Sequence, residues 1–132
     1  MTLPVSNTLQ DYLEAILILN EQDEAVRISD LAQLLGITKP SVTEGVKALA
    51  AQGLLKHEKY GPVFLTAKGK KMALEVRHRH LVLRQFLINV LGVSPSLAEK
   101  DACLMEHAVS SDTVARLVQF MEERLQESLS KK

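Results

Sequence analysis

The sequence of 132 residues has one cysteine and no apolar run of about eighteen residues, the length that a membrane span needs. The single cysteine, Cys103, cannot form an internal disulfide. This is typical of a reducing compartment, and it leaves the thiol available as a metal ligand, a redox group or a core residue. The N-terminus also lacks a basic segment followed by an apolar one. These absences predict a cytoplasmic protein without a membrane span.

The chain also has no net charge at pH 7, because 16 Lys and Arg residues balance 16 Asp and Glu residues. The charge of the whole chain therefore argues neither for nor against binding to nucleic acid. Its distribution is uneven, since residues 67–91 carry six basic residues and a single acid. With 46% apolar residues, the chain can form one globular domain or two small subdomains that share a core.

The hydrophobic periodicity predicts a mainly α-helical protein with one small sheet. A first helix runs from Ser6 or Asn7 to about Glu21, because its apolar residues repeat every 3.6 positions. A short extended segment, 26–28, leads to a second helix at 30–35, which Ser29 caps and Gly36 ends. Further elements are predicted as helices at 38–52 and 67–91, a hairpin of strands at 54–58 and 63–65, a helix from residue 95, and a helix from residue 110 or 111 to about 128.

The helices on either side of Gly36 form a helix-turn-helix pattern, and the hairpin after them has the position of a wing. Thr38 caps the second of these helices, with Pro40 in the first turn, where a missing N–H costs nothing. The polar face of this helix offers short hydroxyl side chains for base edges and lysines for phosphates. The candidate DNA-binding residues are Thr38, Lys39, Pro40, Ser41, Thr43 and Lys47 of this helix, with Lys59 and Tyr60 of the hairpin turn.

Gly45 stands inside the same helix, where glycine costs roughly 1 kcal/mol relative to alanine. A close backbone approach would explain it, and a tolerated surface glycine would explain it equally well.

Three potential metal ligands lie together near the C-terminus. Cys103, Glu106 and His107 are spaced i, i+3 and i+4, which places them on one helix face. Taken alone, a buried cysteine beside a solvated Glu–His pair is the more common arrangement. Three donors are also too few for a closed metal site.

Two other stretches could supply the missing ligands. Asp11 and Glu14 are spaced i and i+3 on the first helix, and His80 lies on the long helix. We hypothesise that one divalent metal draws these stretches and the C-terminal triplet together.

Several stretches of the chain carry a family resemblance when they are taken together. They read D-Y-L-E-A-I-L-I-L from Asp11, I-S-D-L-A-Q-L-L-G-I-T-K-P-S-V-T-E-G-V-K-A-L from Ile28, and D-A-C-L-M-E-H-A-V-S from Asp101. With these motifs the chain resembles the diphtheria-toxin-repressor family of metal-dependent transcriptional regulators, from about residue 8 to residue 125. The helix-turn-helix part alone is common among regulators, but its combination with the carboxylate pair and C-x2-E-H is specific.

The resemblance implies a winged helix-turn-helix DNA-binding domain at 1–70 and an all-helical metal-binding and dimerisation domain at 71–132. The chain stops where long members of the family carry an SH3-like domain, so it resembles the short, manganese-regulator branch. That branch implies a homodimer, not an enzyme, that binds operator DNA and represses genes of metal uptake when Mn(II) or Fe(II) is bound. Zn(II) and Co(II) are expected to bind in vitro.

The family's ligand positions correspond to six residues of this sequence, Asp11, Glu14, His80, Cys103, Glu106 and His107. Cys103 departs from the manganese regulators, which usually place a carboxylate there, whereas iron-responsive members use cysteine. Asp11 points the other way, because iron-responsive members often have methionine at that position. Carboxylates and imidazoles suit Mn(II) and Fe(II), and a thiolate adds affinity for Fe(II), Zn(II) and Co(II).

Arg84 is a second departure, because relatives often place a glutamate there as a ligand of a second ion, and Glu99 occupies another position used for that ion. A guanidinium cannot coordinate a cation. We therefore expect Arg84 to pair with Glu99 in place of a second metal, which leaves one ion per subunit. An arginine that points into water is the alternative.

Two other functional classes stay open on sequence alone. The chain could be a winged-helix regulator that uses Cys103 as a redox sensor. A metal enzyme is remote, because the sequence has no H-E-x-x-H motif and no nucleophile arrangement.

Overall fold

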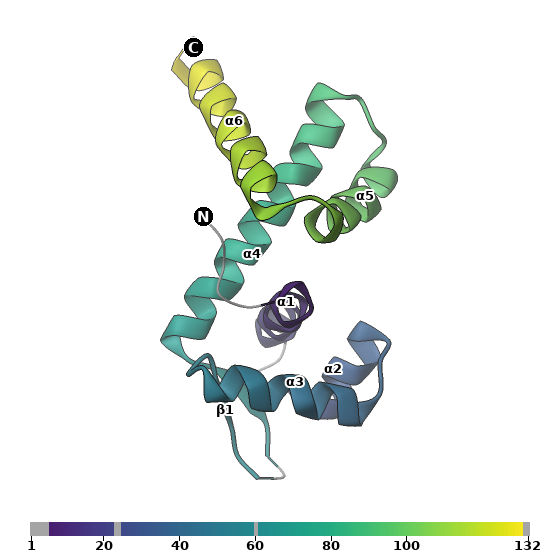
Figure 1. Cartoon of the computed structure of the whole chain (residues 1–132), viewed down its shortest axis with the longest axis vertical. Helices are drawn as coiled ribbons and strands as arrows, with labels where there is room; N and C mark the ends of the chain where they lie inside the picture. The colour runs from purple at the N-terminus through teal and green to yellow at the C-terminus, as the bar shows by residue number, and fades with distance from the viewer. Residues whose placement is uncertain (1–5, 23–24, 60, 131–132) are drawn as a thin grey trace. The chain divides into compact units, whose positions relative to one another are not determined.

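The computed structural model describes residues 6–22, 25–59 and 61–130. The chain divides into an N-terminal unit that ends at Val76 and a C-terminal unit that begins at Arg77, so the division falls inside a helix. The domain boundary expected after residue 70 stays a prediction. The expected fold class is confirmed, since the structure is mainly helical with one two-stranded antiparallel hairpin (Figure 1).

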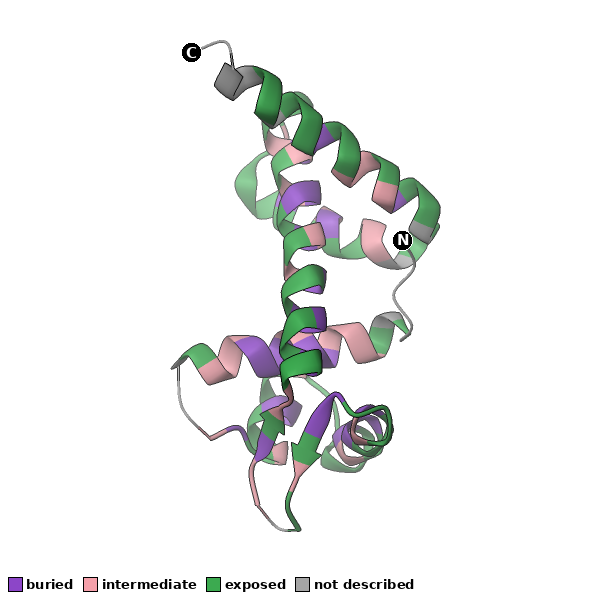
Figure 2. Cartoon of the chain, turned by 90° about the vertical axis from the view of Figure 1, so that its left-hand side faces the viewer, coloured by how far each residue is buried: buried purple, intermediate pink, exposed green. Residues whose placement is uncertain are grey.

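The N-terminal unit contains α1 (Asn7–Gln22), α2 (Ile28–Leu35), α3 (Lys39–Ala51), β1 (Leu55–His57) and β2 (Val63–Leu65). Its buried residues, purple in Figure 2, come from all of these elements. Apolar side chains of α1, α2 and α3 are fully removed from water together with Val63 of the hairpin. The helix-turn-helix pair is therefore packed onto α1 and the hairpin by one shared core.

The start of α2 differs from the prediction. Ile28 is its first residue, so Ser29 lies inside the helix and does not cap it. Arg27 occupies the cap position, and its backbone N–H donates to Oδ2 of Asp30 at 3.1 Å. The extended segment expected before the helix is reduced to one bridge, in which the N–H of Val63 donates to the carbonyl of Val26 at 2.7 Å.

The turn into α3 agrees with the prediction. Gly36 ends α2 with a φ of 68°, in the left-handed region that glycine adopts without strain. Thr38 caps α3, because its Oγ1 accepts a hydrogen bond from the backbone N–H of Ser41 at 3.3 Å. Pro40 lies in the first turn as expected.

Gly45 is buried on the side of α3 that faces α1. A Cβ atom at this position would overlap the ring of Tyr12. Of the two interpretations of this glycine, the close approach is therefore confirmed and the surface glycine is wrong. Glycine lowers the helix propensity here, but its missing side chain allows α3 to lie directly against an aromatic ring.

The hairpin pairs Leu55 with Leu65 and His57 with Val63, which confirms the predicted strands. It leads into α4 (Ala67–Gln85), which Thr66 caps by accepting a hydrogen bond from the N–H of Gly69 at 3.0 Å. The hydroxyl of Thr66 also donates to the carbonyl of Gly53 at 2.7 Å. One side chain thus links the turn after α3 to the start of the long helix.

The long helix does not stay α-helical to residue 91 as predicted. Its last part is the π-helical segment η1 (Phe86–Val90), in which the N–H of Leu91 donates to the carbonyl of Phe86 at 3.3 Å. Gly92, with a φ of 72°, then ends the helix. The sequence has no glycine or proline inside this segment that would mark the change of helix type. Packing of the buried Leu87 accompanies it.

The C-terminal unit has its own core, which joins the end of the long helix to α5 (Pro95–Ala108) and α6 (Ser111–Ser130) (Figure 1). This core is formed by Leu83, Leu87, Ala98, Ala102 and Val114. The alanines of α5 let the helix backbones approach closely. None of the described helices combines the length and apolar composition of a membrane span.

Seven apolar residues of α6 and the end of the long helix separate into two groups. Leu87 and Met121 are buried, and Leu117 and Val118 pack against the core. The exposed members of the set are Val90, Leu91 and Phe120.

Candidate metal centre and nucleic-acid interface

His80 lies on α4 and is 9% exposed, the one buried polar or charged side chain among the described residues. Its Nε2 lies 2.8 Å from Oε1 of Glu99, and its Nδ1 lies 3.5 Å from Oε1 of Glu106. Both carboxylates come from α5, so the helix pairing of the C-terminal unit places the imidazole between them. The two contacts use opposite sides of the ring.

These carboxylates change the chemistry of the imidazole. Glu106, and with it Glu99, raises the pKa of His80 to about 9, although burial alone would lower it. The arrangement thus stabilises a positive charge in a place that is largely shielded from water. The same negative environment would favour a divalent cation.

The Oε1 atom of Glu106 fits a ligand role. It is buried and has no hydrogen-bond partner, and its side chain is 14% exposed. Its ion-pair contact with Nδ1 of His80 at 3.5 Å is longer than a good hydrogen bond, and a buried carboxylate oxygen without a hydrogen bond is costly. A hard, oxygen-binding cation such as Mn(II) would satisfy it, so the residues present fit a metal of this class.

Arg84 and Glu99 form the ion pair that the sequence led us to expect. The Nε of Arg84 lies 3.2 Å from Oε2 of Glu99, while the other oxygen of Glu99 contacts His80. The alternative, an arginine that points into water, is wrong. Glu99 is therefore held by a guanidinium on one side and orients the imidazole on the other.

The other predicted ligands stay predictions. Asp11 and Glu14 are half-buried on α1 of the N-terminal unit. Cys103 is exposed on α5, and the side chain of His107 lies outside the described part of the chain. Considering only the side chains that the structure describes, no group of three or more His, Cys, Asp or Glu residues could hold a metal ion. The residues brought together are His80, Glu106 and Glu99.

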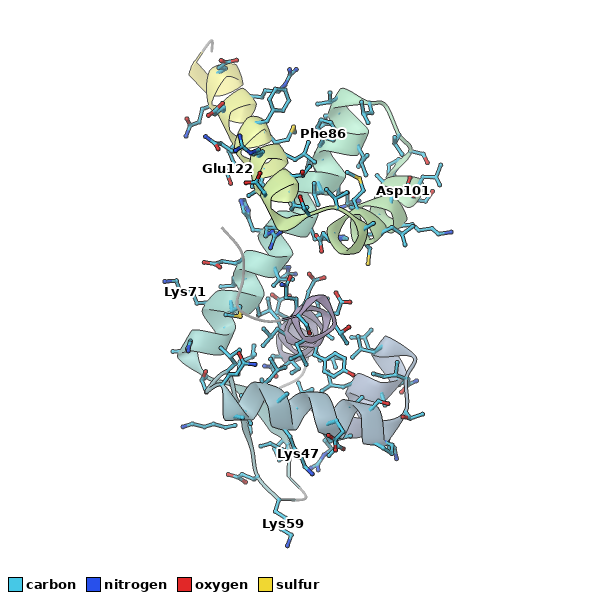
Figure 3. All side chains as sticks on the ribbon, viewed as in Figure 1. Lys47, Lys59, Lys71, Phe86, Asp101 and Glu122 are labelled. Carbon is cyan, nitrogen blue, oxygen red and sulfur yellow. The ribbon has the colours of Figure 1, made fainter. Side chains whose placement is uncertain are left out.

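The predicted nucleic-acid interface lies on the N-terminal unit. Its candidate residues on α3 and in the turn before it are exposed, except for the half-buried Thr43. Figure 3 shows Lys47 on α3 and Lys59 at the tip of the hairpin, with both side chains directed away from the rest of the unit. Tyr60, also predicted to contact DNA, lies outside the described residues.

The hydroxyl groups of this interface have partners within the chain. Thr38 Oγ1 donates to Oγ of Ser41 at 2.9 Å, and Oγ1 of Thr43 donates to the carbonyl of Lys39 at 3.0 Å. These bonds fix the side chains in the first turns of α3. The oxygen of Ser41 still has a hydrogen to donate, so it could meet an acceptor on a base edge or a phosphate.

Two contributions were missed by sequence reasoning. Glu99 was expected to contact Arg84 but not His80, because a contact between different helices leaves no periodic signal. The sequence indicated no polar contact for Tyr12, although its hydroxyl donates to the carbonyl of Ser41 at 3.4 Å. The unusual Gly45 was the signal that could have indicated this contact.

Comparison with protein families assigns both parts of the chain. Residues 5–63 match the model described as iron dependent repressor, N-terminal DNA binding domain. Residues 66–127 match the model described as iron dependent repressor, metal binding and dimerisation domain.

Relatives of similar length agree with this assignment. The chain is 43% identical to the transcriptional regulator MntR of Escherichia coli O157:H7 over 106 residues, which are 80% of this chain and 68% of the relative. It is 37% identical to the HTH-type transcriptional regulator MntR of Bacillus pumilus over 135 aligned positions, covering 100% of this chain and 91% of the relative.

Solved structures show the same fold. A manganese-dependent transcriptional repressor in complex with manganese superposes with a TM-score of 0.74 at 35% identity, over 86% of this chain and 52% of that chain. ScaR with bound Zn2+ gives a TM-score of 0.70 at 30% identity. The chain spans about half the length of these solved structures, 52% and 53%.

Proposed function

This chain belongs to the iron-dependent repressor family, in its MntR-like branch, and from this premise we propose that it is a cytoplasmic, metal-dependent repressor of metal-uptake genes. Mn(II) or Fe(II) is its effector, and a homodimer of the chain binds a double-stranded operator. The observation that carries the proposal is the contact of buried His80 with Glu106, whose buried Oε1 lies 3.5 Å from Nδ1 of His80, has no hydrogen bond and fits a divalent cation.

The residues that would hold the metal are Asp11, Glu14, His80, Cys103, Glu106 and His107. When bound, the ion supplies a positive charge that several carboxylates and imidazoles can share. Glu99 accepts a hydrogen bond from Nε2 of His80, so Nδ1, which faces Glu106, would be the ligand atom once a metal displaces its proton. Arg84 holds Glu99 in place.

The proposed ligands come from both units, since Asp11 and Glu14 belong to α1 and the others to α4 and α5. Shared ligation would fix the orientation of the winged helix relative to the dimerisation unit. A dimer that reads two half-sites needs recognition helices about 34 Å apart, or a multiple of that distance. Metal and operator binding would then be coupled, typically by about 1–3 kcal/mol in each direction.

Lys39 and Lys47 would contact phosphates, and Ser41 would approach a base edge at the start of α3. Lys59 at the tip of the hairpin would reach the backbone of the duplex. No observation in the described part of the chain favours the redox alternative that uses Cys103.

Fluorescence anisotropy of labelled promoter DNA tests the proposal. Chelated protein is titrated separately with Mn(II), anaerobic Fe(II) and Zn(II). Operator affinity should rise at least about tenfold with one of these metals, in line with the coupling energies above. Equal affinity in chelator and in metal would overturn the proposal, and a loss of binding with peroxide alone would favour the redox alternative.

A further inference from the structure

Tyr12 lies on α1 between the two proposed ligands of that helix, Asp11 and Glu14, and is 5% exposed. Its side chain crosses from α1 to α3. The ring lies against Gly45, and the hydroxyl donates to the carbonyl of Ser41 at 3.4 Å. Both contacts fall within the N-terminal unit.

The contact point on α3 is the turn that carries the proposed base-reading residue. Ser41 is held from one side by Thr38, which accepts from its N–H and donates to its hydroxyl. Tyr12 holds it from the other side through its carbonyl. A helix carbonyl has two lone pairs, so it can accept this bond in addition to its bond within the helix.

Gly45 shows that the ring contact is built into α3. Any residue with a Cβ would push the ring of Tyr12 away from this helix. The chain therefore keeps a residue of low helix propensity in the middle of its recognition helix where the aromatic side chain passes. A tyrosine that only filled core volume would not need its hydroxyl placed on the turn of Ser41.

We propose that Tyr12 is the positioning residue that transmits the placement of α1, set by metal binding, to the recognition helix α3. The proposal rests on the proposed function, because α1 must be fixed by the metal for its placement to carry information. Tyr12 itself is neither one of the proposed metal ligands nor one of the proposed DNA-contacting residues. It makes the ligand-bearing helix and the first turns of α3 move as one body.

The test is Tyr12→Phe in the full chain, which removes the hydroxyl and keeps the ring. Three quantities are measured: the affinity for Mn(II) without DNA, the melting temperature, and the operator affinity in Mn(II) and in chelator. The affinity for Mn(II) should stay close to the wild type, and the melting temperature should fall by no more than a few degrees, about the effect of one hydrogen bond. The gain in operator affinity caused by Mn(II) should fall about twofold, the factor expected for a hydrogen bond at the weak end of the usual range, as its length of 3.4 Å indicates.

Ile16→Val is the matched control. It removes one methyl from a fully buried side chain of the same helix and leaves the contact with Ser41 intact. It should lower the melting temperature while the metal-induced gain stays unchanged. Gly45→Ala is a second test of the Tyr12 contact, because the added methyl displaces the ring. It should reduce the metal-induced gain in operator affinity, as Tyr12→Phe does.

The outcomes are distinct. A Tyr12→Phe protein with the full wild-type gain would overturn this inference and leave the proposed function standing. Equal losses in Mn(II) and in chelator would show a purely structural role and would also overturn it. A wild-type protein with no metal-induced gain would overturn the proposed function, and this inference with it.

Discussion

Glu106 keeps a carboxylate oxygen out of water without a hydrogen bond, and an unsatisfied buried polar group costs about 1–3 kcal/mol, more when it is charged. His80 lies 3.5 Å away, too far for a good hydrogen bond. The carboxylate therefore interacts with the charge of His80 but has no hydrogen bond at this oxygen. A ligand that binds between these side chains would relieve the cost.

We predict that Glu106→Gln lowers the affinity for Mn(II) by at least about tenfold, because an amide oxygen is a weaker ligand than a carboxylate for a hard cation. Isothermal titration calorimetry with chelated protein measures the effect. Glu123→Gln, an exposed carboxylate of α6, is the control and should leave the affinity unchanged. Equal affinities for both variants would remove Glu106 from the site.

The Arg84–Glu99 pair predicts one metal ion per chain. A guanidinium 3.2 Å from the carboxylate already supplies the positive charge that a second cation would bring. Metal analysis of Zn(II)-loaded protein after exhaustive desalting should give one ion per chain, and Arg84→Glu should allow a second, weaker one. Two tightly held ions in the wild-type chain would contradict this prediction.

The sequence identified the candidate site only where its signal is local. Cys103, Glu106 and His107 are separated by single helical turns, so spacing alone places them on one face. His80 and Glu99 are nineteen positions apart in the sequence and lie on different helices. Their contact depends on how α4 packs against α5. The pairing of Arg84 with Glu99 was predictable because a resemblance identified both positions.

The helices show the same limit. Gly36 and Thr38 were predicted correctly as a helix end and a cap, because each acts on its own backbone neighbours. Ser29 was wrongly predicted to cap α2. The carboxylate of Asp30 accepts a hydrogen bond from the N–H of Arg27, and the helix begins one residue before Ser29. The π-helical segment was missed because it has no local signal and is accompanied by packing of Leu87.

The contact between α1 and α3 leads to a prediction with an unusual sign. An alanine in place of a helical glycine normally stabilises by about 1 kcal/mol. Gly45→Ala should instead lower the free energy of unfolding by about 1–3 kcal/mol, because the added methyl overlaps the ring of Tyr12. Urea denaturation followed by circular dichroism measures the change.

Two comparison variants define the cause. Glu44→Ala, exposed on the same helix, should alter the free energy of unfolding by less than about 0.5 kcal/mol. Tyr12→Leu combined with Gly45→Ala should recover part of the loss, since the smaller side chain leaves room for the methyl. A Gly45→Ala protein more stable than the wild type would show that the ring yields without cost.

Taken as a whole, the chain leaves several large apolar side chains of the C-terminal unit in water. They are Leu81, Val90, Leu91, Leu97, Leu104 and Phe120. The same residues belong to the stretch that matches a metal-binding and dimerisation domain. Burial of apolar area of this kind drives association of subunits.

We predict that Leu91→Asp and Phe120→Asp shift the protein from dimer to monomer and weaken operator binding, because a monomer reads one half-site. Sedimentation velocity over a range of protein concentrations measures the shift. Leu34→Asp, at a side chain 50% exposed on α2 of the other unit, is the control and should stay dimeric. Unchanged sedimentation of both C-terminal variants would place the dimer contact elsewhere.

The oxygen of Glu106 that lacks a hydrogen bond also matters for the design of assays. A ligand that binds only the folded chain stabilises it and raises its thermal midpoint. The added free energy of unfolding is about 2.7 kcal/mol when the free ligand concentration is a hundred times the dissociation constant. A dye-based melting scan could therefore rank candidate effectors without an operator, a promoter sequence or a labelled oligonucleotide. Glu106→Gln supplies the comparison for such a screen, because a tenfold weaker affinity should reduce the stabilisation to about 1.4 kcal/mol under the same conditions.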